Sequence, residues 1–406
     1  MLVIGAGLAG LSCAYHALLE DPSCEVSVLD AAHLGDGASG RTTGMVTPGI
    51  GQDFAALVRR LGRKQAADLY RASLEAVRAV GDLVAGEGIA CDHEDVGQLV
   101  VAQGPEGPRR LETQAAALES AGLPCVRLDG VALEDRLRFL GDASRGHSLA
   151  ALHLPHAATV NPLRLVHGLA HAVRRRGGKV FERTRVRAIA PGRSARVMLE
   201  SGPVIDAGSV ILATASESTH LTRLTGRVMP ISLKVLATRP LTTAQLAQAG
   251  WPGRECVIDS RRLFNYFRLT SDHRIVFGGG SPAYGAAPAG EPSFEDILRE
   301  LHATFRLGQP LAVERQWWGT IDYTLDGLPV IGAVRPHRNV FYAGGFCGHG
   351  IAMSIHSGRQ VARMALKRAA SPSFAGLRPQ APLVPGDWLR RLCFSAASGW
   401  MRWREA

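Results

Sequence analysis

Residues 2–30, LVIGAGLAGLSCAYHALLEDPSCEVSVLD, decide the fold of this chain. The apolar run at 2–4 is typical of a parallel strand that is buried on both faces. A predicted helix at 8–19 follows it, and a second predicted strand at 26–29 ends at Asp30. The order strand, helix, strand predicts the start of an α/β sheet.

Three glycines, Gly5, Gly7 and Gly10, stand between the first strand and the helix as G-x-G-x-x-G. In that order they allow a tight turn, a close approach of the backbone to a pyrophosphate, and close packing of the helix on the strand. The free N–H groups at the helix start suit phosphate charge. A carboxylate about 20 residues further on, here Asp30, can bind a ribose. The stretch predicts dinucleotide binding, and the alternative is a glycine-rich turn without a ligand.

The composition fits a two-domain α/β protein. The chain has 406 residues, of which 46% are hydrophobic, and 46 glycines. The formal net charge of +10 comes mostly from arginines scattered along predicted helices. Because no recognition module accompanies this charge, we expect no nucleic-acid partner. A positive field could still attract an acidic substrate.

The seven cysteines are dispersed and lack C-x-x-C spacing, which predicts neither a disulfide framework nor a metal site. A reducing compartment, the cytoplasm, is therefore the expected location. No apolar run reaches the length that spans a membrane. The start of the chain also lacks the basic region of a signal peptide.

A second glycine-rich turn lies near the other end of the chain. The predicted strand 340–343 leads into GGFCGHG at 344–350, and a predicted helix at 351–367 follows. This turn, too, directs free N–H groups and a helix N-terminus at something negative. The segment 31–51 is rich in glycine and small residues, so it could pass close to a cofactor. Its alternative is a flexible surface loop.

Seven further motifs follow the opening stretch in a fixed order. They are ASGRTTG at 38–44, TVNPLRL at 159–165, VILAT at 210–214, NYFRL at 265–269, RIVFGGG at 274–280, WWGTIDYT at 317–324 and GFCGHGIA at 345–352. Together they resemble the flavin-dependent D-amino-acid oxidase superfamily, which includes glycine, sarcosine and γ-glutamylputrescine oxidases, over nearly the whole chain. ASGR, YFRL, WxGxxDxT and GFxGHG resemble the γ-glutamylputrescine oxidase branch in particular.

The resemblance implies an α/β flavoprotein of two domains. A Rossmann-like FAD-binding domain would be discontinuous, at 1–50, 151–225 and 320–370. A largely antiparallel β-sheet substrate domain would comprise 51–150 and 226–319. The tail at 371–406 would be a helix packed on the body, and a membrane-surface helix is the alternative.

The resemblance also implies FAD rather than a nicotinamide. Backbone N–H groups at 348–351 would stabilise the charge that develops at N1 and O2 of the reduced ring, and the backbone of Val186 would meet the adenine. The implied FAD contacts are Gly5, Gly7, Leu8, Ala9, Gly10, Asp30, Ala31, Ser39, Gly40, Arg41, Thr42, Thr43, Met45, Val186, Ala213, Thr214, Gly319, Gly345, Phe346, Gly348, His349, Gly350, Ile351 and Ala352.

Three departures from the family pattern bear on the chemistry. Sarcosine oxidases attach flavin through a cysteine near the position of Gly319, so non-covalent FAD is predicted here. The lysine that holds the substrate carboxylate in those enzymes corresponds to Ala352, and the arginine of glycine oxidases near 321–322 is missing. A carboxylate next to the amine needs a cation. These departures argue against a simple α-amino acid, although Arg268 could bind an acid from another direction.

The candidate catalytic residues are Tyr266, Arg268, Trp318, Asp322 and His349, and none is an obvious general base. His349 could bind the substrate amine, tune the flavin or cap the last helix. Asp322 could pair with an ammonium group or be a hydrogen-bonded turn carboxylate. Trp318 could belong to a core rather than to the substrate site.

The expected function is FAD-dependent oxidation of a primary or secondary amine to an imine by hydride transfer to flavin N5, followed by hydrolysis to an aldehyde. The partners would be a small amine and an electron acceptor, either O2 or another molecule. One alternative is an oxidase or dehydrogenase for glycine, sarcosine or D-amino acids. Another is a non-catalytic flavin-binding or RNA-associated protein.

Overall fold

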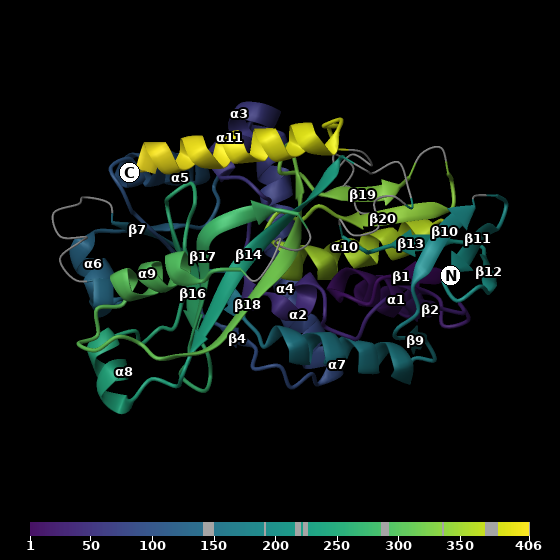
Figure 1. Ribbon diagram of the computed structural model, residues 1–406, viewed down its shortest axis with the longest axis horizontal. Coiled ribbons are helices and arrows are strands. Elements are labelled where there is room, and N and C mark those ends of the chain that lie inside the picture. Colours follow the sequence, from purple (N-terminus) through teal and green to yellow (C-terminus); the bar gives the residue numbers. More distant parts are fainter. Residues whose placement is uncertain are drawn as a thin grey trace.

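The computed structural model of the chain is a mixed α/β fold built on two large sheets (Figure 1). The structure describes residues 1–140, 150–190, 192–215, 221, 226–285, 292–334, 337–369 and 381–405. The helices are α1 (Leu8–Glu20), α2 (Ala38–Arg41), α3 (Phe54–Leu61), α4 (Arg63–Glu87), α5 (Gly107–Ser120), α6 (Gly130–Glu134), α7 (Pro162–Arg175), α8 (Thr243–Ala249), α9 (Glu295–Thr304), α10 (Gly350–Ala365) and α11 (Asp387–Glu405).

A six-stranded sheet holds the opening stretch. Its neighbouring strands, in order, are β19 (Val330–Ala333), β20 (Val340–Gly344), β13 (Val210–Leu212), β1 (Leu2–Ile4), β2 (Ser27–Leu29) and β9 (Lys179–Phe181). All pairings are parallel except that of β19 with β20. The predicted Rossmann-like α/β fold is therefore confirmed, with β1 near the centre of the sheet.

An eight-stranded, mostly antiparallel sheet forms the second layer. Its order is β18 (Val313–Thr324), β14 (Val228–Thr238), β17 (Ile275–Tyr284), β16 (Tyr266–Leu269), β15 (Cys256–Asp259), β5 (Gln98–Val101), β7 (Ala151–Leu154) and β6 (Val126–Leu128). Two three-stranded sheets complete the described strands: β10 (Val186–Ala190), β11 (Ala195–Leu199) and β12 (Val204–Ala207), and β3 (Met45–Val46), β8 (Ala158–Thr159) and β4 (Glu94–Asp95).

The predicted domain division stays a prediction, with two differences at its boundaries. The strand β7 and the end of β18 lie in the eight-stranded sheet, whereas the predicted boundaries put residues 151–154 and 320–324 in the FAD domain. The tail is helical from Asp387, and residues 371–380 and 406 lie outside the described part of the chain. Residues 216–220 also lie outside it.

Three local features depend on contacts that a sequence pattern does not show. The helical region after Asp53 is two helices that meet at Gly62, whose φ is +80°, and the Asp53 side chain makes no capping hydrogen bond. The segment 179–189 forms two strands in separate sheets. Arg175 and Arg176, at the end of α7, do more than complement a helix dipole, because they pair with Glu87 at 2.7 and 2.6 Å.

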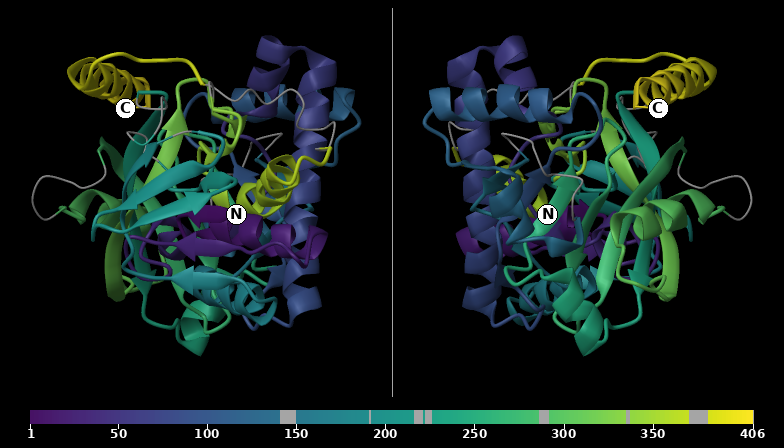
Figure 2. Two further views of the ribbon diagram at one scale, coloured as in Figure 1. Left: turned by 90° about the vertical axis from the view of Figure 1, so that its right-hand side faces the viewer. Right: turned by 90° about the vertical axis from the view of Figure 1, so that its left-hand side faces the viewer.

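Helix α1 is packed tightly on both sides. A Cβ on Gly10 would lie 1.9 Å from the carbonyl oxygen of Gly5, so only glycine lets α1 pack this closely against the turn after β1. A Cβ on Gly358 of α10 would lie 2.3 Å from Ser12 Oγ and 2.9 Å from the Cys13 nitrogen. Figure 2 shows α10 beside α1, with the long α4 helix against them. These two glycine contacts therefore set the position of both α1 and α10.

Gly358→Ala should separate α1 from α10, because the added methyl group meets the backbone nitrogen of Cys13 as well as a side chain. Overpacking of this kind costs about 1–3 kcal/mol, so urea unfolding should show a lower free energy of unfolding. The matched control is Gly86→Ala in α4, where a Cβ meets nothing within 4 Å. An equal effect of the two substitutions would contradict the packing argument.

The interface of α1 and α10 also contains two histidines, His16 and His356, that burial keeps neutral. Burial lowers the pKa of His16 from 6.5 to about 4, and the charge of nearby Arg359 lowers it further. His356 behaves in the same way. The unfolded chain binds protons below pH 6.5 while the folded chain does not, so the free energy of unfolding should fall as the pH drops from 6.5 toward 4.

His16→Gln should reduce this loss between about pH 7 and about pH 5, where each buried neutral histidine contributes up to about 1.4 kcal/mol per pH unit. The measurement is the free energy of unfolding from urea titrations at several pH values. The exposed His171→Gln serves as the control and should keep the wild-type slope. Equal slopes for wild type and His16→Gln would rule the explanation out.

Candidate functional site

The first glycine turn brings β1, α1 and β13 together. Gly5 has a φ of +102°, and a Cβ there would lie 2.4 Å from the carbonyl oxygen of Ala213. Gly7 is the N-cap of α1 and offers no capping side chain. Asp30 accepts hydrogen bonds from the N–H of Ala6 at 2.7 Å and of Ala32 at 2.8 Å, so its carboxylate is held beside the turn.

The segment 38–45 connects this turn to the edge of the eight-stranded sheet. Ser39 Oγ accepts the N–H of Leu8 at 2.9 Å, which places the hydroxyl at the N-terminus of α1. Arg41, the last residue of α2, packs against β18: its Nη1 donates to the carbonyl of Trp318 at 3.3 Å, and its guanidinium carbon lies 5.6 Å from the centre of the Trp318 ring. A Cβ on Gly319 would lie 3.1 Å from Arg41 Cβ. The segment 38–45 therefore contacts both the start of α1 and the strand β18, which are far apart in the sequence.

The second glycine turn joins β20 to α10. Gly345, Cys347 and Gly348 all have left-handed backbones, with φ of +72°, +49° and +97°. The buried carboxylate of Asp322 accepts the N–H of Gly345, and burial raises the pKa of this carboxyl above its ordinary value. Asp322 thus has the hydrogen bond expected of a turn carboxylate, and its pairing with an ammonium group stays a prediction. This hydrogen bond fixes the backbone of the second glycine turn at Gly345.

His349 stands at the N-cap position of α10, but its side chain does not cap the helix. Its Nδ1 is buried and has no hydrogen-bond partner in the described part of the chain. Burial lowers the pKa of His349, which a hydrogen bond with the Thr47 backbone partly offsets, so the ring is neutral at neutral pH. Gly49, with φ of +116°, covers the ring, since a Cβ there would lie 2.9 Å from His349 Cε1. Because buried polar atoms are normally hydrogen-bonded, the unpaired Nδ1 of His349 is a candidate for binding a ligand.

Arg268 and Tyr266 lie on β16 of the large sheet. Arg268 is buried, and its Nε and Nη2 donate to the carbonyls of Thr43 at 2.5 Å and of Val160 at 2.9 Å. Arg268 thus links the backbone of Thr43, within the segment 38–45, to the backbone of Val160. Tyr266 lies over Gly278 of β17, where a Cβ would be 2.3 Å from its ring, and burial raises the pKa of its hydroxyl.

Other predicted contacts lie in elements outside the two glycine turns or have buried side chains. Val186 begins β10 in a separate three-stranded sheet, and Met45 lies in β3, paired with Thr159. Ala352 is 2% exposed and belongs to the main hydrophobic core, so its side chain faces packed residues. Phe346 is also buried.

The sequence did not indicate two residues that shape the site. Lys234 of β14 lies directly opposite Trp318 in the sheet and pairs with Asp296 at 2.7 Å. Tyr342 of β20 is fully buried and donates its hydroxyl to the carbonyl of Ala215 at 2.9 Å. The strand register places Lys234 opposite Trp318, and the tertiary fold places the Tyr342 hydroxyl at Ala215. No local sequence motif predicts either contact.

The two turns fit the chemistry of a dinucleotide. The N-cap residues of α1 and α10 make no side-chain cap, and neither helix has an acidic residue in its first turn. Ser39 Oγ accepts the N–H of Leu8, and the remaining helix-start N–H groups suit negative charge. A Cβ on Gly348 or Gly350 would meet nothing within 4 Å, so this stretch of backbone is open to close approach. Asp30 at one turn and His349 Nδ1 at the other supply further hydrogen-bonding groups.

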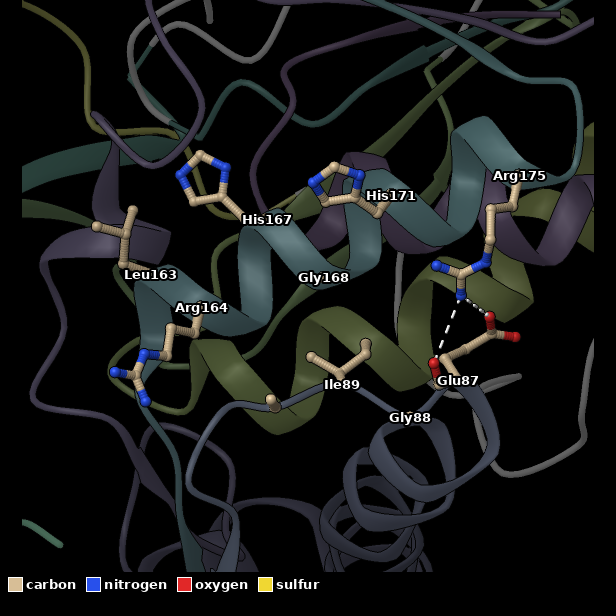
Figure 3. Close-up of a pocket in the computed structure, with 10 residues that line it drawn as sticks. Glu87, Gly88, Ile89, Leu163, Arg164, His167, Gly168, His171 and Arg175 are labelled. Atoms are coloured by element: carbon tan, nitrogen blue, oxygen red, sulfur yellow. Dashed lines mark hydrogen bonds and ion pairs between the residues drawn. The ribbon is translucent and has the colours of Figure 1, made fainter.

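A separate groove of about 410 Å³ lies between α7 and the end of α4 (Figure 3). Its lining includes Arg164, His167, His171 and Arg175 of α7 with Glu87 of α4, and Figure 3 shows both histidines on one side of the helix. None of its lining residues belongs to either glycine turn.

Comparison with known proteins gives a consistent result. Residues 1–364 match the family model described as FAD dependent oxidoreductase, DAO. Gamma-glutamylputrescine oxidoreductase of Escherichia coli (strain K12) is 30% identical over 401 residues, which cover 96% of this chain and 88% of that protein. Sarcosine oxidase subunit beta of Rhodobacter capsulatus is 23% identical over 378 residues, 90% of this chain and 84% of that protein.

The solved structure of glycine oxidase from Geobacillus kaustophilus superposes with a TM-score of 0.78 at 19% identity, covering 95% of this chain and 98% of that one. That likeness shows the fold, while the family match covers most of the length of the chain. The chain belongs to the DAO family of FAD-dependent oxidoreductases and is an FAD-dependent enzyme that acts on CH–NH groups.

Proposed function

We propose that the enzyme oxidises a primary or secondary amine that carries no carboxylate next to the reacting nitrogen, giving an imine that hydrolyses to an aldehyde. The observation that supports this proposal is that neither candidate position offers a free cation to such a carboxylate. Ala352 is buried in the core, and Arg268 directs two of its nitrogens to the carbonyls of Thr43 and Val160. A carboxylate brought into the site would need a charged partner.

FAD, when bound, supplies the two-electron acceptor. We propose that the N–H groups at the start of α1 hold its pyrophosphate, that Asp30 holds the ribose, and that the N–H groups of 348–351 face the negative end of the ring system. The flavin is held without a covalent bond in this proposal. Gly319 supports this, because it faces Arg41 Cβ and has no side chain to link.

His349 is proposed to bind the reacting amine or the flavin through Nδ1. The ring is neutral because burial lowers its pKa, so it can accept a hydrogen bond from an ammonium group and hold that proton away from solvent. Trp318, with Arg41 above its ring, would form the wall beside the site. The substrate must lose its ammonium proton before oxidation, because only the neutral amine has a free lone pair on nitrogen.

A glycine- or sarcosine-type activity is the second candidate. The similarity to sarcosine oxidase subunit beta favours it, whereas the similarity to gamma-glutamylputrescine oxidoreductase favours the first. The two candidates differ in one chemical group, the carboxylate next to the nitrogen.

An anaerobic panel of amines separates them. Putrescine-like amines with a distant carboxylate or none should bleach the flavin absorbance, while glycine and sarcosine should leave it unchanged. Peroxide and artificial-dye readouts, run in parallel on the same panel, identify the electron acceptor. Bleaching by α-amino acids alone would overturn the proposal in favour of the second candidate, and bleaching by no amine would overturn both.

His349→Gln should lower the rate of flavin reduction by about 10²-fold while FAD stays bound, because a positioned side chain that takes a proton from the reacting group contributes about 10²-fold or more. Stopped-flow reduction of the flavin measures the effect. Gly49→Ala tests the same ring without changing it, since the added methyl group would lie 2.9 Å from His349 Cε1. If both variants reduce flavin at the wild-type rate, His349 has no part in the reaction.

A further inference from the structure

The C-terminal helix α11 packs on the body of the protein along one side. Tyr284 of β17 contacts Phe394, with ring centres 6.1 Å apart, and its hydroxyl accepts Arg390 Nε at 2.9 Å. Arg390 Nη1 also donates to the carbonyl of Val384 at 2.8 Å, and Ser398 is buried. These contacts fix which side of the helix faces away from the protein.

The outward side carries large apolar groups. Trp388 is 71% exposed and Leu392 is 58% exposed, and residues four apart lie on the same face of a helix. Trp400, further along, is 45% exposed, with the guanidinium of Arg262 5.1 Å from its ring centre. Figures 1 and 2 show α11 at the outer edge of the molecule. An exposed tryptophan and leucine on one face of a helix indicate a docking surface.

The charge of α11 is positive. Its sequence has four arginines, at 390, 391, 402 and 404, against the two acids Asp387 and Glu405 at its ends. Arg391 is exposed at the flank of the helix, with its Nε 2.6 Å from Asp387 and its guanidinium carbon 5.3 Å from the ring centre of Tyr284. The whole chain has a formal net charge of +10. Tryptophan and leucine with flanking arginines are the composition of helices that lie in the interface of an anionic membrane.

We propose that the face of α11 formed by Trp388 and Leu392, with Arg391 at its flank, docks on an anionic phospholipid surface. In the part of the chain that the structure describes, no helix is long and apolar enough to cross a bilayer, so the contact would be peripheral. A second copy of the chain fits this face less well, because it would bring two arginine-rich helices together. This inference is independent of the substrate proposed above.

Sedimentation of the FAD-loaded, full-length protein with vesicles tests the proposal. Vesicles of phosphatidylcholine and phosphatidylglycerol in equal parts should bind the protein at least about tenfold more tightly than phosphatidylcholine alone, since each arginine near an anionic surface contributes attraction. The double variant Trp388→Ser with Leu392→Ser should weaken binding to the mixed vesicles by at least about tenfold, because it removes apolar area that the interface buries.

The control is Val131→Ser on α6, which changes an apolar side chain that is 72% exposed at another place and should bind like wild type. Unchanged flavin absorbance and amine-to-dye activity show that the double variant is folded. Three outcomes would overturn the proposal: no binding of wild type to either vesicle, equal binding of wild type and double variant, or a dimer in light scattering that the double variant abolishes while vesicles bind neither protein.

Discussion

The close packing of α1 on both sides is the constraint on which the rest of the site depends. At Gly10 the helix touches the turn after β1, and at Gly358 the helix α10 touches α1. A side chain at Gly10 would push α1 away from this turn, and one at Gly358 would push α10 away from α1. Because a glycine turn leads into each of these helices, the contacts fix the relative position of the two helix starts.

Buried polar groups then hold the turns in shape. The Asp322 carboxylate accepts the N–H of Gly345, and Asp30 accepts the N–H groups of Ala6 and Ala32. A carboxylate so placed satisfies backbone donors in a bent segment that has no regular partners. Ser39 Oγ accepts the N–H of Leu8, while the N-cap residues Gly7 and His349 make no side-chain cap on either helix. We propose that the remaining N–H groups at the two helix starts bind the cofactor.

Local spacing explains which features the sequence predicted. The glycines at 5, 7 and 10 and the helix after them follow one another along the chain, so their pattern identifies β1, α1 and the Rossmann-like sheet. The role of Asp322 depends on Gly345, which is 23 residues away in the turn after β20. The sequence therefore favoured a turn carboxylate only slightly over a partner for an ammonium group. Lys234 and Tyr342 reach the site only through strand register and folding. The cover that Gly49 makes over His349 is likewise a contact between distant segments.

The central claim is that both glycine turns bind one FAD molecule. Hydrogen–deuterium exchange of the flavin-free protein, before and after one equivalent of FAD is added, tests it most directly. Peptides that cover 5–12 and 345–353 should both lose deuterium uptake when FAD binds, because their helix-start N–H groups become hydrogen-bonded or screened from solvent. Protection confined to one of the two peptides, or seen in neither, would contradict the account.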